Sequence, residues 1–379
     1  MLLISINSLG EYTGGGIYAR SIYSGLSKFG SVVVVAKANL DGIDTIGPQV
    51  VELRKGFTQD FFARVLLCPA FTGFYIVKLL RHIRQHQTIV FHNSRQGGVL
   101  WLGRLLFPRK KFIMCFDNVE QLLLRSSKPV GFVKKMMNLV DSFLIKSIER
   151  LAYRNADVCT FITAADRQFF LQRYGEKKRD SIVVPVSLPV IKTPKRGEYL
   201  AEPMNVLFTA SFTFPPNLSA MYEFIDLALL AGSEFQFYLA GKGLDRVADE
   251  RLRRLNNLHL ISDPDDKEMD RLFSKGDIYL APVRQGSGMK TKVAEALRYG
   301  LPVIATEHAL IGYEAIINND YIMQYESATE ALRSLHNYKQ YTAAERHKLH
   351  CAAYDAFLNN YSDSAASDHF KPILDLLKT

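Results

Sequence analysis

The chain has 379 residues, of which 48% are hydrophobic and 22% are charged. This composition excludes disordered and fibrous architectures, and the length predicts two domains. The formal net charge of +9 is unevenly divided: residues 1–200 hold 29 Lys and Arg against 14 Asp and Glu, whereas residues 201–379 hold 18 against 24. The basic half predicts an anionic partner (a membrane surface, a phospholipid-linked glycan or nucleic acid), with a solvated basic surface as the alternative.

In chain order, the first half alternates strands and helices. Met1–Ile6 reads as a strand without the features of a secretory leader, so we expect a cytoplasmic protein. Gly14–Gly16 forms a turn before a helix at 17–29, and the β-branched run Ser31–Ala36 is typical of a strand buried in a parallel sheet. A long amphipathic helix is expected at about 133–154. Further strands are expected at 88–92, 112–116, 158–162 and 182–186.

Two apolar segments of the first half could belong to the core. Val65–Val77 is too short to span a bilayer and contains Pro69 and Gly73. We expect it in the core, with a helix lying on a membrane as the alternative. Trp101 and its apolar neighbours are also expected in the core. These neighbours are Leu100, Leu102, Leu105, Leu106 and Phe107.

Pro189–Pro203 is rich in proline and charge and predicts a linker. After it, the strand–helix pattern restarts. Strands are expected at 205–209, 235–240, 258–261, 278–281 and 302–305, and helices at 218–231, 267–275, 289–299, 328–336, 343–360 and 369–377. The alternation predicts two doubly wound α/β domains, whose ligands bind beyond the carboxyl ends of the strands.

A strand, a glycine-bearing turn and a helix start follow one another at 278–290, and Gly300 ends that helix. Free N–H groups at a helix start, aided by the helix dipole, form a ready site for an anion such as a diphosphate. Arg284, Lys290 and Lys292 add positive charge, and Glu295 lies where a carboxylate can accept ribose hydroxyls. The alternative is an ordinary strand–turn–helix junction with a surface glutamate.

The string Gly286–Thr306 resembles the donor-binding signature of family-four retaining glycosyltransferases, particularly bacterial members that assemble surface polysaccharides. Other blocks resemble the family in the same order: Gly14–Tyr18 its glycine loop, Asn118–Glu120 its acceptor-domain block, Phe208–Asn217 the start of its nucleotide domain, and Leu239–Gly243 its central strand–loop. The resemblance covers roughly residues 1–315.

The resemblance implies a GT-B fold of two Rossmann-like, doubly wound parallel-sheet domains facing a central cleft. We expect an acceptor-binding domain at 1–190, a linker at 191–203, a nucleotide-sugar-binding domain at 204–355 and a C-terminal helix at 356–379 that packs back towards the first domain. The implied reaction moves a sugar, with retention, from a UDP- or GDP-linked donor to a glycan or polyprenyl-diphosphate-linked acceptor. The implied pathways are O-antigen lipopolysaccharide, capsule or exopolysaccharide biosynthesis.

Candidate site residues follow from the resemblance and from the strand ends. On the donor side they are Gly15, Gly16, Arg284, Ser287, Gly288, Met289, Lys290 and Glu295. On the acceptor side they are His92, Asp117, Asn118 and Glu120, where His92 equally fits a simple loop role. The catalytic candidates are Lys290, Glu295, Asp117 and Lys242. We expect no metal and no other cofactor, because lysines and helix amides can stabilise the leaving diphosphate.

The sequence departs from the family pattern at three places. Ser287 stands where the first of a usual pair of glutamates would fall, Phe208–Asn217 lacks the usual Arg and Lys, and Asp117 replaces a histidine. The positive charge must then come from Lys242, Arg284 or Lys290. Asp117 could alter the choice of sugar or act on the acceptor.

A nucleotide-sugar isomerase or hydrolase and a non-catalytic scaffold stay open. A Rossmann oxidoreductase is disfavoured because Gly14–Gly16 lacks Gly-x-Gly-x-x-Gly spacing, and nucleic acid because no binding module is present. Asp263–Asp266 predicts a turn and helix cap rather than a metal motif. The four cysteines lack metal-ligand spacing, and three lysines of the long helix either contact lipid headgroups or are solvated: Lys134, Lys135 and Lys146.

Overall fold

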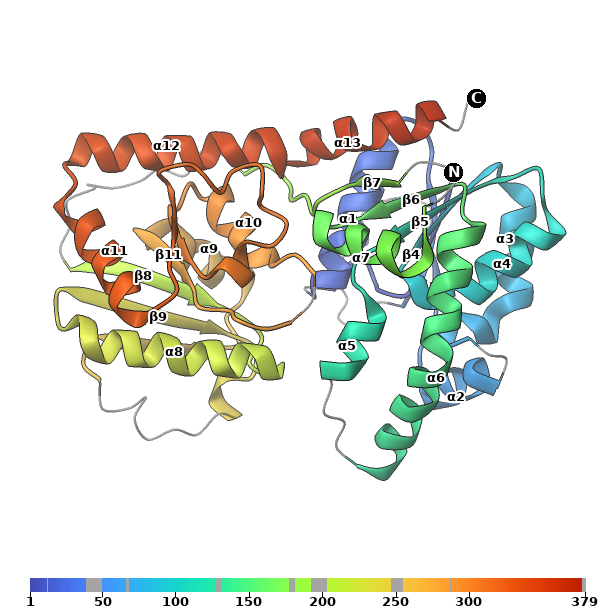
Figure 1. Cartoon of the computed structure of the whole chain (residues 1–379), viewed down its shortest axis with the longest axis horizontal. Coiled ribbons are helices and arrows are strands. Elements are labelled where there is room, and N and C mark those ends of the chain that lie inside the picture. The colour runs from blue at the N-terminus through green and yellow to red at the C-terminus, as the bar shows by residue number, and fades with distance from the viewer. Residues whose placement is uncertain are drawn as a thin grey trace. The chain divides into compact units, whose positions relative to one another are not determined.

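The computed structural model describes residues 1–11, 13–38, 50–65, 68–126, 131–176, 181–191, 203–246, 255–286 and 288–376. The chain divides into two compact units (Figure 1). The first unit contains Met1–Ser187 and Asp363–Thr379, and the second contains Leu188–Ser362. Most of the predicted linker, 192–202, lies outside the described residues, as does Ser287.

The first unit contains a seven-stranded parallel sheet in the order β3-β2-β1-β4-β5-β6-β7. Its strands are β1 (Leu2–Ser5), β2 (Val33–Lys37), β3 (Val50–Leu53), β4 (Thr88–His92), β5 (Lys111–Phe116), β6 (Val158–Phe161) and β7 (Ser181–Val183). Its helices are α1 (Gly14–Ser27), α2 (Phe57–Val65), η1 (Phe71–Tyr75), α3 (Ile76–Gln85), η2 (Ser94–Gln96), α4 (Gly97–Leu106), α5 (Glu120–Ser126), α6 (Phe132–Asn155), α7 (Ala164–Tyr174) and α13 (Asp363–Leu376). The last helix, α13, packs against α1.

The second unit contains a six-stranded parallel sheet in the order β10-β9-β8-β11-β12-β13. Its strands are β8 (Met204–Thr209), β9 (Phe235–Gly241), β10 (Leu258–Ser262), β11 (Ile278–Ala281), β12 (Val303–Ala305) and β13 (Ile322–Gln324). Its helices are α8 (Pro215–Ala231), η3 (Leu244–Arg246), α9 (Asp266–Lys275), α10 (Thr291–Arg298), η5 (Glu307–Leu310), α11 (Ala328–Gln340) and α12 (Ala343–Asn360).

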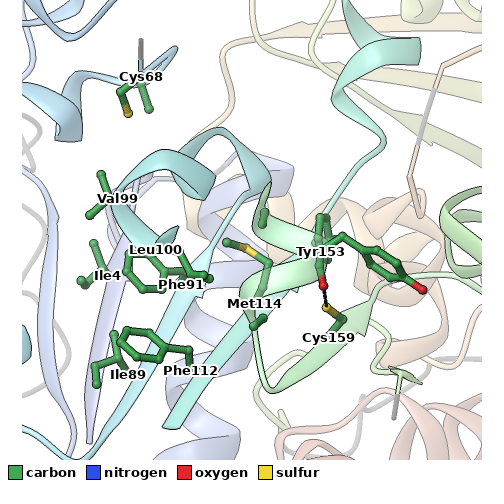
Figure 2. Close-up of a cluster of buried hydrophobic side chains, with 14 of the residues drawn as sticks. Ile4, Cys68, Ile89, Phe91, Val99, Leu100, Phe112, Met114, Tyr153 and Cys159 are labelled. Atoms are coloured by element: carbon green, nitrogen blue, oxygen red, sulfur yellow. Dashed lines mark hydrogen bonds between the residues drawn. The ribbon is translucent and has the colours of Figure 1, made fainter. Parts of the chain in front are cut away.

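The core of the first unit lies on its central strands. Every residue of β1 is buried, as expected of a strand packed on both faces. Figure 2 shows Ile4, Ile89, Phe91 and Phe112 from three neighbouring strands in one cluster. The rings of Phe91 and Phe112 stack with centroids 6.5 Å apart. The central strands are therefore fixed by packing, and the loops at their ends can carry polar groups.

Each sheet has a point at which the strand order reverses. In the first unit it lies between β1 and β4, and in the second between β8 and β11. The loops that follow such a pair of strands run to opposite sides of the sheet, so a crevice opens beyond the carboxyl ends of the pair. The topology thus indicates the ends of β1 and β4, and of β8 and β11, as the places for ligands.

The predicted fold is confirmed, since both halves form doubly wound parallel sheets. The core prediction for Trp101 and its neighbours is wrong in part. Leu100 is fully buried, but Trp101, Leu105 and Leu106 are exposed, because the run forms α4 and a helix presents only one face to the core. The core prediction for Val65–Val77 is also right only in part: Cys68, Ala70 and Phe71 are buried, whereas Phe74 and Val77 are exposed. None of the described helices could span a membrane.

Helices α4 and α6 pack closely against each other at Gly97. A Cβ atom added to Gly97 of α4 would lie 2.2 Å from the Ile148 carbonyl oxygen of α6. We expect Gly97→Ala to push the two helices apart and lower the free energy of unfolding by about 1–3 kcal/mol, as overpacking does. Urea unfolding measures the change. The control is Gly14→Ala, where a Cβ meets nothing within 4 Å; equal losses in both variants would contradict the prediction.

Candidate functional site

The loop between β11 and α10 contains the main donor-side candidates. Gly286 and Gly288 have φ angles of 108° and 69°, a left-handed conformation that glycine adopts without strain. Lys290 is the N-cap residue of α10, and its Nζ donates to the Gly288 carbonyl oxygen at 2.9 Å. The glycines therefore fold the loop back so that a lysine ammonium lies over it. Met289 is buried beneath the loop.

The start of α10 is held by a buried tyrosine. The Tyr313 hydroxyl donates to the Lys290 carbonyl oxygen and accepts from the Ala294 N–H, both at 2.8 Å. Burial raises the pKa of Tyr313 well above its ordinary value. The described residues offer no partner to the N–H groups of Thr291 and Lys292. These two amides, at the positive end of the helix dipole, are suited to an anion.

Glu295 lies on the same short helix, one turn after the unpaired amides. Its Oε2 accepts from Lys292 Nζ at 2.6 Å, and its side chain is largely buried. The pair fixes the carboxylate beside the helix start. Its remaining oxygen is available to a hydroxyl-bearing ligand. Gly300, with a φ of 64°, follows the helix end as the sequence predicts.

Arg284 is held away from the helix start by another ion pair. Its guanidinium donates two hydrogen bonds to Glu223 of α8, at 2.8 and 2.9 Å, and a third to the Glu326 carbonyl oxygen. It also lies 5.5 Å from the ring centre of Tyr325. A fork-shaped contact of this kind fixes the side chain. The positive charge at the start of α10 is consequently supplied by Lys290 and Lys292.

Lys242 lies on the neighbouring loop, after β9. A Cβ atom at Gly241 would lie 1.8 Å from the Ala210 carbonyl oxygen, and Phe212 donates its N–H to the Lys242 carbonyl oxygen at 2.9 Å. The loops after β8 and β9 are thus packed backbone to backbone. The Lys242 side chain is exposed and has no partner among the described residues. It remains a candidate for contact with phosphate.

His308 on η5 is a neighbour of this loop that the sequence did not indicate. Thr306 caps η5 by accepting from the Ala309 N–H at 3.2 Å. The His308 ring lies against the backbone of Gln285 and Gly286, and burial followed by the charge of Lys290 lowers its pKa. The sequence feature that could have indicated His308 is its position just after β12, because β12 lies beside β11 in the sheet.

The acidic segment 263–266 forms a turn and a helix cap, as predicted. Asp265 is the N-cap residue of α9 and accepts from the Glu268 N–H at 2.8 Å. Asp263 has a positive φ of 49° and accepts from the Gly243 N–H at 3.3 Å. Across the described residues, no group of three or more His, Cys, Asp or Glu is arranged to hold a metal ion.

Three polar side chains meet at the strand ends of the first unit. Ser5 Oγ of β1 lies 2.9 Å from the Asn7 carbonyl oxygen and 2.9 Å from His92 Nδ1. His92 Nε2 faces Asp117 Oδ2 across 3.5 Å. This nitrogen is buried and has no other partner among the described residues. His92 and Asp117 therefore form a buried pair at the crevice.

Asn93 links the acceptor-side candidates. It is buried with a φ of 80°, a conformation that costs a residue other than glycine about 1–3 kcal/mol. Its Nδ2 donates to Asp117 Oδ1 at 3.0 Å and to Glu120 Oε1 at 2.7 Å. The other Glu120 oxygen accepts from Arg95 Nε at 2.8 Å. Asn118 lies half-buried between these two acids.

A buried glutamate of α6 supports the same block. Glu149 accepts from the Glu120 N–H at 2.8 Å and from Gln121 Nε2 at 2.7 Å. Burial raises the pKa of Glu149 from 4.5 to about 7. The charge of Glu120 acts in the same direction. The start of α5 is thus fixed by a carboxyl group that gains a proton near neutral pH.

Gly15 and Gly16 begin α1, whose N-cap residue is Thr13. A Cβ atom at Gly16 would lie 2.3 Å from the Glu11 carbonyl oxygen, and one at Gly15 would lie 2.7 Å from Asn7 Oδ1. The loop before α1 therefore needs both glycines for its own packing. Their contact with a donor stays a prediction.

Part of the second unit matches a known protein family. Residues 203–337 match the profile of the family described as "Glycosyl transferases group 1". The chain is 23% identical over 205 residues to "Uncharacterized 44.6 kDa protein in cps region" of Klebsiella pneumoniae, and the match covers 50% of this chain and 52% of that protein. The chain thus matches about half the length of this curated relative.

Solved structures resemble the chain over nearly its whole length. Sucrose-phosphate synthase from Thermosynechococcus elongatus has a TM-score of 0.70 at 15% identity, covering 99% of this chain and 98% of that one. HepE from Anabaena, in complex with UDP and glucose, has a TM-score of 0.71 at 13% identity, covering 99% of both chains. The fold is accordingly GT-B, and residues 203–337 match the group 1 glycosyl transferase family. The prediction of a glycosyltransferase is confirmed as far as the GT-B fold and the family match over residues 203–337.

The role of Asn93 leads to a prediction. We expect Asn93→Ala to lower the free energy of unfolding by about 1–3 kcal/mol, because two buried carboxylates lose a donor. Asn93→Asp should cost more at pH 8, since it adds a third carboxylate beside Asp117 and Glu120. Urea unfolding at pH 8 and pH 5 checks both, and the gap between the two variants should narrow at pH 5. An aspartate variant as stable as the wild type at pH 8 would contradict the network.

The buried Glu149 predicts a pH dependence. Its pKa is raised in the folded protein, so its stabilising contribution is complete below pH 4.5 and is lost as the pH rises through about 7. We expect the wild type to lose on the order of 3 kcal/mol relative to Glu149→Gln between pH 4.5 and 8. Urea unfolding at several pH values measures the slope, so a constant offset of the variant does not matter. Parallel pH profiles would contradict the assignment.

Proposed function

We propose that the protein transfers a sugar from a nucleotide-diphosphate donor, UDP- or GDP-linked, to a glycan or lipid-linked glycan, with retention of anomeric configuration. The family match over residues 203–337 supports glycosyl transfer. HepE was solved with UDP-glucose, which supports a nucleotide-sugar donor. The name of the Klebsiella pneumoniae relative, from a cps region, supports a place in surface polysaccharide biosynthesis, as capsule, O-antigen lipopolysaccharide or exopolysaccharide.

The observation that carries the proposal is the start of α10. The N–H groups of Thr291 and Lys292, unpaired among the described residues, lie beside Lys290 Nζ, the Lys292 ammonium and the Glu295 carboxylate. In this proposal the diphosphate takes the amides and Lys290, and the ribose hydroxyls take the free oxygen of Glu295. Lys242, from the loop after β9, adds a second cation. Cations and amides fixed before the reaction stabilise the charge that develops on the leaving group.

The proposed chemistry needs no protein base. The bond between the anomeric carbon and the phosphate oxygen breaks, and a bond between that carbon and the acceptor hydroxyl oxygen forms on the same face of the sugar. The departing phosphate oxygen takes the proton of that hydroxyl, so charge and atoms balance. The protein contributes leaving-group stabilisation and orientation of the reactants. Neither role requires a metal ion where Lys290 and the helix amides supply the charge.

The first unit is proposed to bind the acceptor. Its candidates, His92, Asp117 and Glu120, are joined through Asn93 at the crevice between β1 and β4. Carboxylates and imidazole nitrogens accept hydrogen bonds from sugar hydroxyls. The 29 Lys and Arg among residues 1–200, against 14 acidic residues, favour an anionic acceptor such as a polyprenyl-diphosphate-linked glycan. We accordingly propose a cytoplasmic enzyme working at the inner face of the plasma membrane.

Two substitutions test the donor site. We expect Lys290→Ala to lower sugar transfer about 100-fold or more, as loss of one stabilising group does. Glu295→Ala should weaken nucleotide binding about 10- to 150-fold, as expected for a charged hydrogen-bonding group. Thermal shift with UDP, GDP, ADP and dTDP first selects the nucleotide, because a ligand of the folded state raises the melting temperature. Transfer is then followed by release of that nucleotide.

The matched controls are Lys275→Ala and Glu268→Ala on α9, both exposed residues of the same unit. They should leave the nucleotide affinity and the transfer rate unchanged. Wild-type transfer by Lys290→Ala, or wild-type affinity in Glu295→Ala, would remove the donor-site assignment. Release of free sugar or an epimer without an acceptor would instead identify a hydrolase or isomerase.

A further inference from the structure

The first unit exposes a cluster of phenylalanine rings on α2 and η1. We call Phe57, Phe61, Phe62 and Phe74 the aromatic patch; Phe57 is 63% exposed and the others are 41–49% exposed. The rings contact one another in sequence, with centroid distances of 6.1 Å from Phe57 to Phe61, 5.7 Å from Phe61 to Phe62 and 6.3 Å from Phe62 to Phe74. Single exposed apolar residues are ordinary, but a continuous exposed patch indicates a binding surface.

The first half of α6 exposes a second apolar surface. We call Phe132, Met136, Leu139 and Phe143 the α6 stripe, because their spacing places them along one face of the helix. Phe132 is 78% exposed and Phe143 is 75% exposed. The opposite face of α6 carries the buried residues Asp141 and Ile145. The protein therefore covers one face of the helix and leaves a second, apolar face exposed.

An ion pair joins α2 to α6. Arg64 of α2 donates two hydrogen bonds to Asp141 of α6, each at 2.8 Å. Arg95 donates to the same carboxylate at 3.1 Å. Figure 1 shows α2 beside α6. Because Asp141 lies on the face of α6 opposite the stripe, this ion pair attaches α2, with its aromatic patch, to the covered face of α6.

The exposed charges of α6 itself are all positive. Both acidic residues of α6, Asp141 and Glu149, are buried, whereas its basic residues are all exposed. These are Lys134, Lys135, Lys146, Arg150 and Arg154. Lys55, just before α2, is exposed too. A surface that presents phenylalanine, leucine and methionine among lysines and arginines is complementary to an anionic lipid surface, which has an apolar layer beneath phosphate headgroups.

We propose that the aromatic patch and the α6 stripe dock the protein onto an anionic phospholipid bilayer, with the phenylalanine rings in the interfacial layer and the lysines on the headgroup phosphates. The helices lie on the membrane, since no described helix is able to cross it. The inference deepens the proposed function, because such docking brings the first unit to a lipid-linked acceptor. It rests on exposure and charge and stands even if the donor chemistry is different.

Co-sedimentation of the full chain with vesicles tests the proposal. We expect binding to vesicles rich in phosphatidylglycerol, and much weaker binding to pure phosphatidylcholine. Phe132→Ser with Phe143→Ser should lower partitioning into the anionic vesicles about tenfold or more at both low and high salt, because apolar insertion is not screened. Lys134→Glu with Lys135→Glu should weaken binding mainly at low salt, since the loss is electrostatic.

The matched control is Leu229→Ser with Leu230→Ser, which removes two exposed apolar side chains of α8 in the second unit. It should partition as the wild type does. Failure of the wild type to bind anionic vesicles, or an equal loss in the control, would overturn the proposal. So would a wild-type oligomer that Phe132→Ser with Phe143→Ser dissociates without a change in vesicle binding, because the surface would then bind protein.

The readout uses neither donor nor acceptor, so it separates the two proposals. Vesicle binding without any sugar transfer would keep the docking surface and remove the proposed function. Sugar transfer to a soluble acceptor without vesicle binding would keep the proposed function and remove the docking surface.

Discussion

The start of α10 depends on the hydroxyl of Tyr313. That hydroxyl donates to the Lys290 carbonyl oxygen and accepts from the Ala294 N–H. The N–H groups of Thr291 and Lys292 lie in the first turn and have no acceptor within the helix. In the proposed donor site an anionic ligand pairs with them. Gly286 and Gly288 give the loop the backbone it needs to bring Lys290 to the same place. The donor-side candidates thus share one physical cause.

In the first unit, side chains rather than backbone groups hold the buried polar residues in place. Asp117 and Glu120 lie buried near each other, and Asn93 holds them together at the expense of a strained backbone. Glu149 fixes the start of α5 from behind and titrates near neutral pH. Buried polar groups that are fully satisfied define a rigid arrangement. In both units the polar groups gather where the strand order reverses, as parallel sheets require.

The sequence predicted the two sheets because their central strands are continuous apolar runs, such as Ser31–Ala36. It did not indicate β3 or β13, which are short and lie at sheet edges. Loop glycines, Lys290 and Glu295 were found because they lie within one string. Tyr313, Asn93 and Glu149 were not, since their roles arise from contacts between distant parts of the chain. The exposure of Trp101 and of the α6 stripe was not predicted for a similar reason. The sequence of a helix does not show which of its apolar residues the rest of the protein covers.

A crystal structure of the protein with the selected nucleoside diphosphate bound tests the donor site most directly. The phosphate oxygens should lie within hydrogen-bond distance of the Thr291 and Lys292 N–H groups and of Lys290 Nζ, and the ribose hydroxyls should contact Glu295. The second unit should keep its Tyr313 contacts unchanged, because the site is already formed. A nucleotide bound elsewhere, or one whose phosphates leave the start of α10 empty, would contradict the central claim.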